Sequence, residues 1–238
     1  MEPIALEFAA TETYRPEIIR RSLESFRANL GGVDWDRSRC CVNLDPIPRN
    51  AVNPARLTAI VDAIAGVFPT FSLADVHFAR KPNFARAVKW AWTAPTGCFG
   101  DRFFYLQMDW ILTRRVSIAD LVALLDRDDG RIAVNLRAHR ANMRERLCLS
   151  PVLIRRSTAR ELADAMTDAD GPEAQLRPPS FRRGGRSLAV GLQSLHWPAD
   201  RVVEDIGRDW MDREGFVKDG GSNFTRWKKP LREEVSVA

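Results

Sequence analysis

The sequence lacks any apolar run long enough to span a bilayer, and its first three residues lack the basic and apolar segments of a secretory signal. We therefore expect a cytoplasmic protein without a membrane span. Cysteine is scarce, and the spacing of its four residues matches no zinc-binding pattern. Internal repeats and low-complexity tracts are also absent. We expect reduced thiols in or near the core at Cys40, Cys41, Cys98 and Cys148.

Hydrophobic residues make up 45% of the 238-residue chain, enough to bury a substantial core as one large domain or one domain with a subdomain. The net charge is +5, and arginine is far more frequent than lysine. This composition favours anionic partners such as nucleotide phosphates or a nucleic acid, although a genome rich in G and C produces the same bias. The basic excess is concentrated between residues 131 and 186.

Apolar segments that suit strands alternate with segments of helical periodicity. We expect strands at 4–10, 40–45, 71–78, 103–109, 131–136 and 147–154. Helices are expected from Pro16 to the Gly31-Gly32 stop, and at 53–67, 84–92, 117–125 and 157–166, with Ser117 as a cap. This alternation predicts an α/β protein whose mainly parallel central sheet carries helices on both faces.

The stretch from Thr96 to Leu112 is the centre of this pattern. A turn-rich segment leads into the apolar run 103–106, which ends on the acid Asp109. Ligands of open α/β sheets bind at the carboxyl ends of the strands, and a carboxylate there can hold a divalent cation. The alternative is an Asp that caps the next turn or pairs with an arginine. Asp45 likewise ends the second strand, just before Pro46.

Several short motifs occur in a familiar order: 11–30, Asn43-Leu-Asp-Pro46, 83–90, Phe104-Tyr-Leu-Gln-Met-Asp-Trp110, Ser150-Pro, Pro172-Glu173, Asp205-Ile-Gly-Arg-Asp-Trp210 and Gly215-Phe-Val-Lys218. Their order resembles that of glycosyltransferases with the A-type (GT-A) fold, especially the family-two-like nucleotide-sugar transferases. Where that family has two or three acids in its Asp-x-Asp motif, this chain has Gln107, Met108 and Asp109. Only the last acid is retained.

The resemblance implies a single Rossmann-like GT-A domain over residues 1–230 with a C-terminal acceptor-side extension. Residues 1–112 would form the nucleotide-sugar-binding half, 113–230 the acceptor-side half and 231–238 a tail. It implies metal-dependent transfer from a nucleotide-sugar donor, expected to be a UDP-sugar, to an acceptor hydroxyl. Asp109 would bind Mn²⁺ or Mg²⁺. The acceptor stays open among a hydroxylated DNA base, a lipid, a protein and a saccharide.

The resemblance also assigns donor-binding residues. It places Thr11, Thr13 and Arg15 near the base and ribose. Asp45 would accept hydrogen bonds from the base or sugar edge, and Lys81 and Asn83 would lie beside the ribose or diphosphate. The ordinary alternatives are a helix cap for Thr13, a surface charge for Arg15 and a turn residue for Asp45.

Because only one acid of the Asp-x-Asp motif is retained, part of the charge or of the metal ligation would have to come from other residues. The candidates for it are Arg186, His196 and Lys218. Arg186 ends the basic loop 181–186, which could close over a diphosphate, contact a nucleic-acid backbone or simply be solvated. His196 could also be a metal ligand, a base or a structural hydrogen-bond partner.

An inverting transfer needs a general base for the acceptor hydroxyl. Glu173, at an expected helix start, is the first candidate and Asp170 the second. A helix N-terminus keeps a carboxylate ionised but makes it a weaker base.

Other functions remain open. One is a non-catalytic protein that retains a nucleotide or glycan pocket. Another is a nucleotidyltransferase, which would need at least two clustered carboxylates. A plain nucleic-acid-binding protein is the weakest alternative, since no recognition motif is present.

Overall fold

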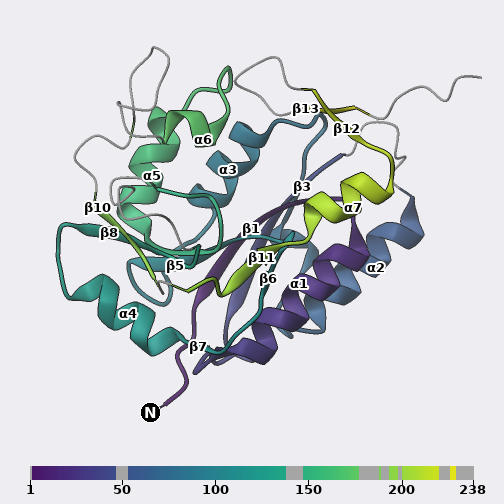
Figure 1. Cartoon of the computed structure of the whole chain (residues 1–238). Coiled ribbons are helices and arrows are strands. Elements are labelled where there is room, and N and C mark those ends of the chain that lie inside the picture. The colour runs from purple at the N-terminus through teal and green to yellow at the C-terminus, as the bar shows by residue number, and fades with distance from the viewer. Residues whose placement is uncertain are drawn as a thin grey trace, which may run out of the picture.

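The computed structural model describes residues 2–46, 53–137, 147–176, 188, 193–197, 200–219 and 226–228. Its centre is a seven-stranded sheet of order β10-β8-β9-β5-β1-β3-β4 (Figure 1). Strand β9 runs antiparallel to its neighbours β5 and β8, and the other pairs are parallel, which confirms the expected mainly parallel sheet. In chain order the strands are β1 (Glu7–Thr13), β3 (Arg39–Asp45), β4 (Val76–Phe78), β5 (Arg102–Gln107), β8 (Arg131–Asn135), β9 (Val152–Arg155) and β10 (Gln193–His196).

Helices cover both faces of this sheet (Figure 1). One core cluster joins strand residues such as Phe104 to helices α1, α2 and α4, and a second joins Phe103 to helices α3 and α5. Because neighbouring residues of a strand point to opposite faces, a strand buried on both faces reads as a continuous apolar run. The helices are α1 (Pro16–Asn29), α2 (Pro54–Ala65), α3 (Phe84–Thr93), α4 (Ile118–Asp126), α5 (Arg156–Ala165), α6 (Pro172–Gln175) and α7 (Gly207–Arg213).

Polar side chains fix where several helices begin. Asn53 accepts a hydrogen bond from the Arg56 amide at the start of α2, and Ser117 accepts one from the Asp120 amide at the start of α4. These contacts satisfy amide groups that have no partner within the helix. The expected Ser117 cap is confirmed.

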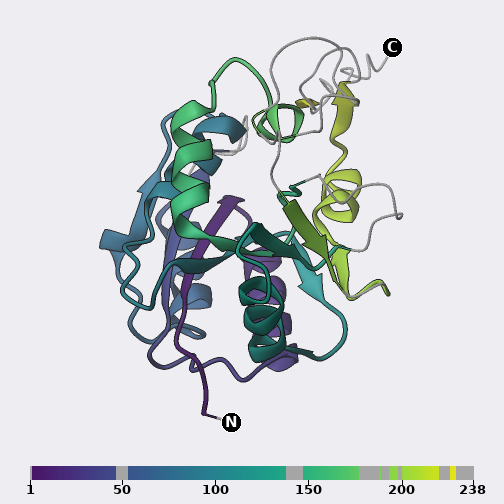
Figure 2. The same ribbon diagram turned by 90° about the vertical axis from the view of Figure 1, so that its left-hand side faces the viewer.

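Three short strand pairs lie outside the large sheet. They are β6 (Trp110–Leu112) with β11 (Val203–Asp205), β2 (Leu30–Gly31) with β7 (Val116–Ser117), and β12 (Val217–Asp219) with β13 (Arg226–Lys228). Figure 2 shows β6, β11 and α7 together along one side of the molecule. The antiparallel pairing of β6 with β11 therefore brings residues 203–213 to the end of β5.

Some local predictions were wrong. Residues 11–13, expected in a loop, continue β1, because parallel pairing to β3 extends through Thr13. The segment 71–78 is only partly a strand, since a 3₁₀ turn, η1 (Leu73–Asp75), precedes β4. Cys98 is exposed in a turn, whereas the other three cysteines are buried, and all four are free thiols. None of the helices in the described ranges is both long and apolar enough to cross a membrane.

Candidate functional site

Three neighbouring strands of the sheet end beside one another. β1 lies between β3 and β5, with Thr13 opposite Asp45 and Thr11 opposite Gln107. All three strands are parallel, so their carboxyl ends meet at one edge, where open α/β sheets bind ligands. The structure thus brings Thr11, Thr13, Asp45 and Asp109 to the same edge, as the sequence predicted.

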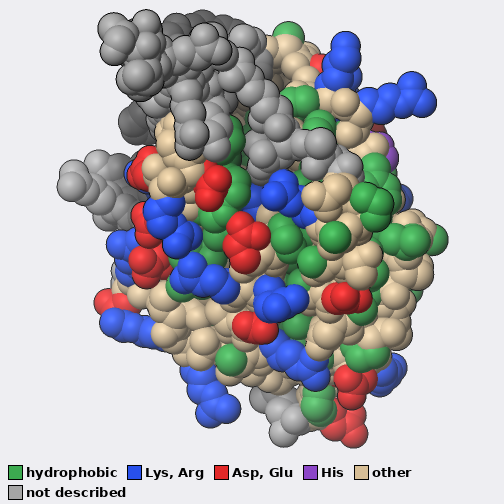
Figure 3. Space-filling model, turned by 90° about the vertical axis from the view of Figure 1, so that its right-hand side faces the viewer, with side chains coloured by type: hydrophobic (Ala, Val, Ile, Leu, Met, Phe, Trp, Pro, Cys, Tyr) green, Lys and Arg blue, Asp and Glu red, His purple; other side chains and the backbone are tan. Residues whose placement is uncertain are grey.

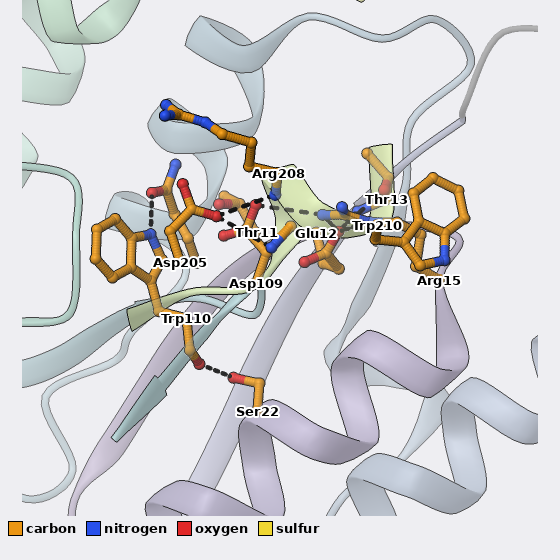
Figure 4. Close-up of polar contacts among 12 residues, drawn as sticks. Thr11, Glu12, Thr13, Arg15, Ser22, Asp109, Trp110, Asp205, Arg208 and Trp210 are labelled. Atoms are coloured by element: carbon orange, nitrogen blue, oxygen red, sulfur yellow. Dashed lines mark hydrogen bonds and ion pairs between the residues drawn. The ribbon is translucent and has the colours of Figure 1, made fainter. Parts of the chain in front are cut away.

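A cluster of charged residues occupies this edge, in which Glu12 and Arg15 are buried and Asp109 is partly exposed (Figure 4). The Glu12 carboxylate accepts a 2.8 Å hydrogen bond from Arg15 Nε, and Arg15 Nη2 lies 3.3 Å from Asp109 Oδ2. The Arg15 side chain is only 3% exposed and that of Glu12 only 2%. Arg15 is therefore not a surface charge, and charges this deeply buried need the partners they have.

The junction of β1 and α1 directs Arg15 to this place. Pro16 occupies the first turn of α1, a position that suits proline because no amide donor is needed there. Arg15 is the residue between strand and helix, and its guanidinium lies 5.3 Å from the centre of the Trp210 ring. Trp210 in turn donates from Nε1 to the Glu17 carboxylate. Helix α7 thereby holds the outer side of the cluster.

Two atoms of the cluster lack partners. Arg15 Nη1 and Asp109 Oδ1 are buried and make no hydrogen bond to any described residue. Burial, together with the negative charges of Glu12 and Asp205, raises the pKa of Asp109 to about 7, although Arg15 opposes this rise. A buried donor or acceptor without a partner is costly in a folded protein, and a bound ligand can satisfy both atoms.

The segment after β11 packs directly on Asp109. The Ile206 amide donates to the Asp109 carbonyl at 2.8 Å, and a methyl group at Gly207 would lie 2.5 Å from Asp109 Oδ2. The Asp205 carboxylate accepts from the amides of Gly207 and Arg208 and lies on the Trp110 side of Asp109 (Figure 4). Glycine is required here because the backbone approaches the carboxylate so closely.

The sequence indicates no site role for Glu12, Asp205 or Gly207. For Trp210 it leaves open stacking on a sugar or base and a place in the core. Asp205, Gly207 and Trp210 all lie in the Asp205-Ile-Gly-Arg-Asp-Trp210 motif. For Asp205 and Gly207, the signal available in the sequence was an acid two residues before a glycine at a strand-to-helix junction. For Glu12 the signal was an acid within a segment otherwise expected to be apolar or hydroxylated.

On the donor side, Asp45 is held by neighbouring groups. Its carboxylate accepts from Asn43 Nδ2 at 2.9 Å and from the Asn83 amide at 3.1 Å. Burial raises the pKa of Asp45, and these hydrogen bonds oppose the rise. Asn43 Oδ1 also shares a 2.6 Å hydrogen bond with His77 Nδ1. Asp45 is therefore a buried, oriented carboxylate and more than a turn residue.

The other predicted donor residues are placed as follows. Thr11 shares a 2.8 Å hydrogen bond with the Tyr105 hydroxyl, and the Thr13 hydroxyl donates to Glu12, so Thr13 is not a helix cap. Asn83 caps α3 by accepting from an amide of its first turn. Lys81 is exposed just before that helix. All lie near Asp45 or the end of β1.

The predicted bases lie at the start of α6. Glu173 is exposed in the first turn of α6, and Asp170 is half-buried just before it. Burial raises the pKa of Tyr105, and the charges of Asp109 and Glu173 raise it further. Glu173 therefore lies within electrostatic reach of the sheet edge. Its role as the base stays a prediction, as does that of Asp170.

Three predicted residues have side chains outside the described part of the structure. Arg186 lies wholly outside it. His196 ends β10, which is separated from β5 by β8 and β9, and Lys218 lies in β12, but neither side chain is described. Their proposed contributions of charge or ligation stay predictions.

The resemblance implies a divalent cation, for which Asp109 would supply one ligand oxygen. Its Oδ1 is buried and unpartnered, whereas its other oxygen faces Arg15. Within the described ranges, no three His, Cys, Asp or Glu side chains gather as a metal site. The residues present thus fit a cation that takes its other ligands from a donor diphosphate and water, and not a cation bound by the protein alone.

Comparison with known proteins bears on the fold. No protein-family model and no curated protein sequence matches the chain. Among solved structures, TarS of S. aureus matches with a TM-score of 0.54 at 9% identity, over 89% of this chain and 38% of TarS. The galactosyltransferase LgtC, solved with donor and acceptor sugar analogues, matches at 0.43 and 11% identity over 80% of this chain and 73% of LgtC.

A further structure, 4-diphosphocytidyl-2C-methyl-D-erythritol synthase, matches at 0.47 and 10% identity over 88% of this chain and 97% of that protein. The conclusion on fold rests on TarS, of which this chain spans only 38% of the length, together with the sheet order. The chain has an α/β fold of the GT-A type, as its sequence predicted.

Proposed function

We propose that this protein transfers a sugar from a nucleotide-sugar donor to an acceptor hydroxyl. The observation that carries the proposal is the charged cluster of Glu12, Arg15 and Asp109 at the carboxyl edge of the sheet, which holds a buried unsatisfied donor atom and a buried unsatisfied acceptor atom. A diphosphate suits both atoms, because its oxygens accept from Arg15 and share a cation with Asp109. The GT-A-type fold supports the same conclusion.

The donor would lie across the ends of β1, β3 and β5. Asp45 would accept a hydrogen bond from the nucleobase or ribose, since its carboxylate is already oriented by Asn43 and Asn83. Lys81 is exposed beside the same edge and would face the diphosphate. A UDP-sugar is the expected donor.

In the reaction, the acceptor oxygen attacks the anomeric carbon of the sugar, and the bond from that carbon to the diphosphate breaks. The acceptor proton passes to a carboxylate, for which Glu173 and then Asp170 are the candidates. Arg15 would stabilise the charge that develops on the departing nucleoside diphosphate, because a buried guanidinium acts strongly where water is excluded. Asp109 would hold Mn²⁺ or Mg²⁺, which supplies further positive charge to that diphosphate.

Thermal unfolding with UDP, GDP, ADP and CDP, each with and without Mn²⁺, tests this proposal. A ligand present at 100 times its dissociation constant stabilises the folded state by about 2.7 kcal/mol. We expect one diphosphate to raise the Tm with Mn²⁺, and Asp109→Ala to abolish that rise. Asp62→Ala, on the exposed side of α2, is the control. If no diphosphate shifts the Tm, the proposal fails.

The second candidate is a protein of the same fold that binds a nucleotide or glycan without turnover. The observation that favours it is the pairing of Asp109 with Arg15, together with the lack of any group of three metal-ligating side chains among the described residues. Release of UDP from a bound UDP-sugar distinguishes the two. Binding without any release, in the presence of candidate acceptors and Mn²⁺, would favour the second candidate.

A further inference from the structure

A pocket of about 460 Å³ lies beside the charged cluster, outside the residues assigned to the donor. Its wall includes one aromatic residue and charged residues of both signs: Trp110, Arg201, Glu204, Asp205, Arg208 and Asp209. This volume is within the range of pockets that take small ligands. The strand pair β6–β11 and the start of α7 form most of its wall, and Arg137 and Arg201 complete it from outside these elements.

The pocket shares its wall with the proposed catalytic site. Trp110 directly follows Asp109, and Asp205 pairs with Trp110 in the β6–β11 register. Figure 4 shows Trp110, Asp205 and Arg208 on one side of Asp109, and Glu12, Arg15 and Trp210 on the other. A molecule in this pocket would therefore approach Asp109 from the side opposite Arg15.

The polar groups of the pocket are available to a ligand. Charged residues of both signs line the pocket. Even so, the side chains of Glu204, Arg208 and Asp209 make no hydrogen bond or ion pair to any other residue in the described ranges. Arginine only donates hydrogen bonds and an ionised carboxylate only accepts them. The wall thus offers both kinds of partner.

The balance of these groups selects among acceptor classes. A hydroxyl group both donates and accepts, so a polyol can bond to arginine and carboxylate at once. A phosphate only accepts. It could bond to the arginines of the wall, including Arg137 and Arg201, but it would meet as many like-charged carboxylates, those of Glu204, Asp205 and Asp209. A site built to bond hydroxyl groups also discriminates strongly against ligands that lack them.

The surrounding surface agrees with this selection. Figure 3 shows Lys and Arg side chains interspersed with Asp and Glu on the face over α1, α2 and α7, with no continuous basic stripe. Nucleic-acid backbones are bound by basic surfaces that neutralise phosphates. This face therefore offers no such track.

We propose that this pocket binds the acceptor and that the acceptor is a hydroxyl-rich, uncharged saccharide. Its role as the acceptor site rests on the proposed transferase function, whereas saccharide binding itself does not. Glu204 and Asp209 accept hydrogen bonds from sugar hydroxyls, Arg208 donates to them, and the edge of Trp110 contacts the ring. The reacting hydroxyl then faces the donor across Asp109.

Binding of defined probes to the full chain, without nucleotide, tests the pocket. The probes are the methyl pyranosides of glucose, galactose, mannose and N-acetylglucosamine, inorganic phosphate, and an eight-residue oligothymidylate. Saturation-transfer NMR and calorimetry measure their affinities for wild type, Glu204→Ala and Arg208→Ala. Exposed residues away from the pocket provide matched controls, Glu161→Ala on α5 and Arg127→Ala after α4.

We expect at least one pyranoside to bind, with at least tenfold weaker binding in Glu204→Ala and Arg208→Ala and no change in the controls. The proposal is overturned if no pyranoside binds, if the pocket variants bind as wild type does, or if only phosphate or the oligonucleotide binds through Arg208. The UDP thermal shift is recorded on the same samples. If UDP binds and no pyranoside binds, the proposed saccharide pocket is overturned but the transferase function is not. If a pyranoside binds and UDP does not, the transferase function is overturned but the saccharide site remains.

Discussion

Substituting Gly207 tests whether α7 is packed on Asp109 as described. A methyl group at this position would lie 2.5 Å from Asp109 Oδ2 and 2.7 Å from Asp109 Cβ, both far inside van der Waals contact. Rotation of the Asp109 side chain relieves only the first contact. Its backbone cannot retreat freely, because the Asp109 carbonyl accepts from the Ile206 amide at 2.8 Å. The start of α7 must therefore move in Gly207→Ala.

Overpacking of this kind destabilises by roughly 1–3 kcal/mol. For a chain of this size, a loss of about 2 kcal/mol lowers the Tm by roughly 4–8 °C. Urea unfolding followed by circular dichroism measures the change. Gly31→Ala is the control, because its methyl group would lie 3.8 Å from the Val116 carbonyl, an ordinary contact, and we expect a change within about 0.5 kcal/mol.

A double variant separates this clash from other effects on α7. Asp109→Ala removes the carboxylate but keeps Cβ, so Gly207→Ala should cost less in that background, with a coupling energy of about 1 kcal/mol. Displacement of α7 also moves Trp210 away from Arg15, which should alter tryptophan fluorescence. If Gly207→Ala costs no more than Gly31→Ala, or if its cost is the same with and without the Asp109 carboxylate, the close approach is refuted.

Three further predictions concern the charged groups. Because burial and Glu12 raise the pKa of Asp109 to about 7, above the unfolded value of about 3.9, the folded state holds this proton to higher pH; the resulting stability is present below pH 4 and is lost as pH rises through 7. Urea unfolding should therefore show Asp109→Asn gaining on wild type between pH 4 and pH 8, by up to about 4 kcal/mol, and a pH-independent difference would contradict this. Glu12→Ala leaves Arg15 buried without its main partner and should cost about 3 kcal/mol in the same assay. Arg37→Ala, at an exposed ion pair, should cost less than about 1 kcal/mol, and equal losses would argue against a buried cluster. Asp45→Asn should weaken the binding of UDP with Mn²⁺, measured by calorimetry, by about tenfold, since a charge-assisted hydrogen bond is stronger than a neutral one. Asp62→Asn on α2 is the control. Unchanged affinity in Asp45→Asn would remove Asp45 from the donor site.

Periodicity predicted the layers of this fold because it depends on residues close together in the sequence. A strand buried on both faces must be apolar throughout, as 103–106 is, and a helix must repeat its apolar residues every three or four positions, as α1 does. Strand ends follow from the same patterns, and this is why Asp45 and Asp109 could be placed at one edge. The extent of β1 was missed, because pairing with β3 and not local composition extends it through Thr13.

The sequence by itself determined the alternating α/β order, the resemblance to GT-A enzymes and the two acids at strand ends, of which Asp45 ends β3 and Asp109 lies two residues beyond β5. The tertiary structure alone decided that Arg15, 94 residues away from Asp109, pairs with it, and that Gly207 and Trp210 close over that pair. The pocket between β6, β11 and α7 was equally invisible in the sequence. Such contacts depend on strand order and on how a distant helix packs, because side chains far apart in the chain become neighbours only when the sheet edge and α7 are assembled.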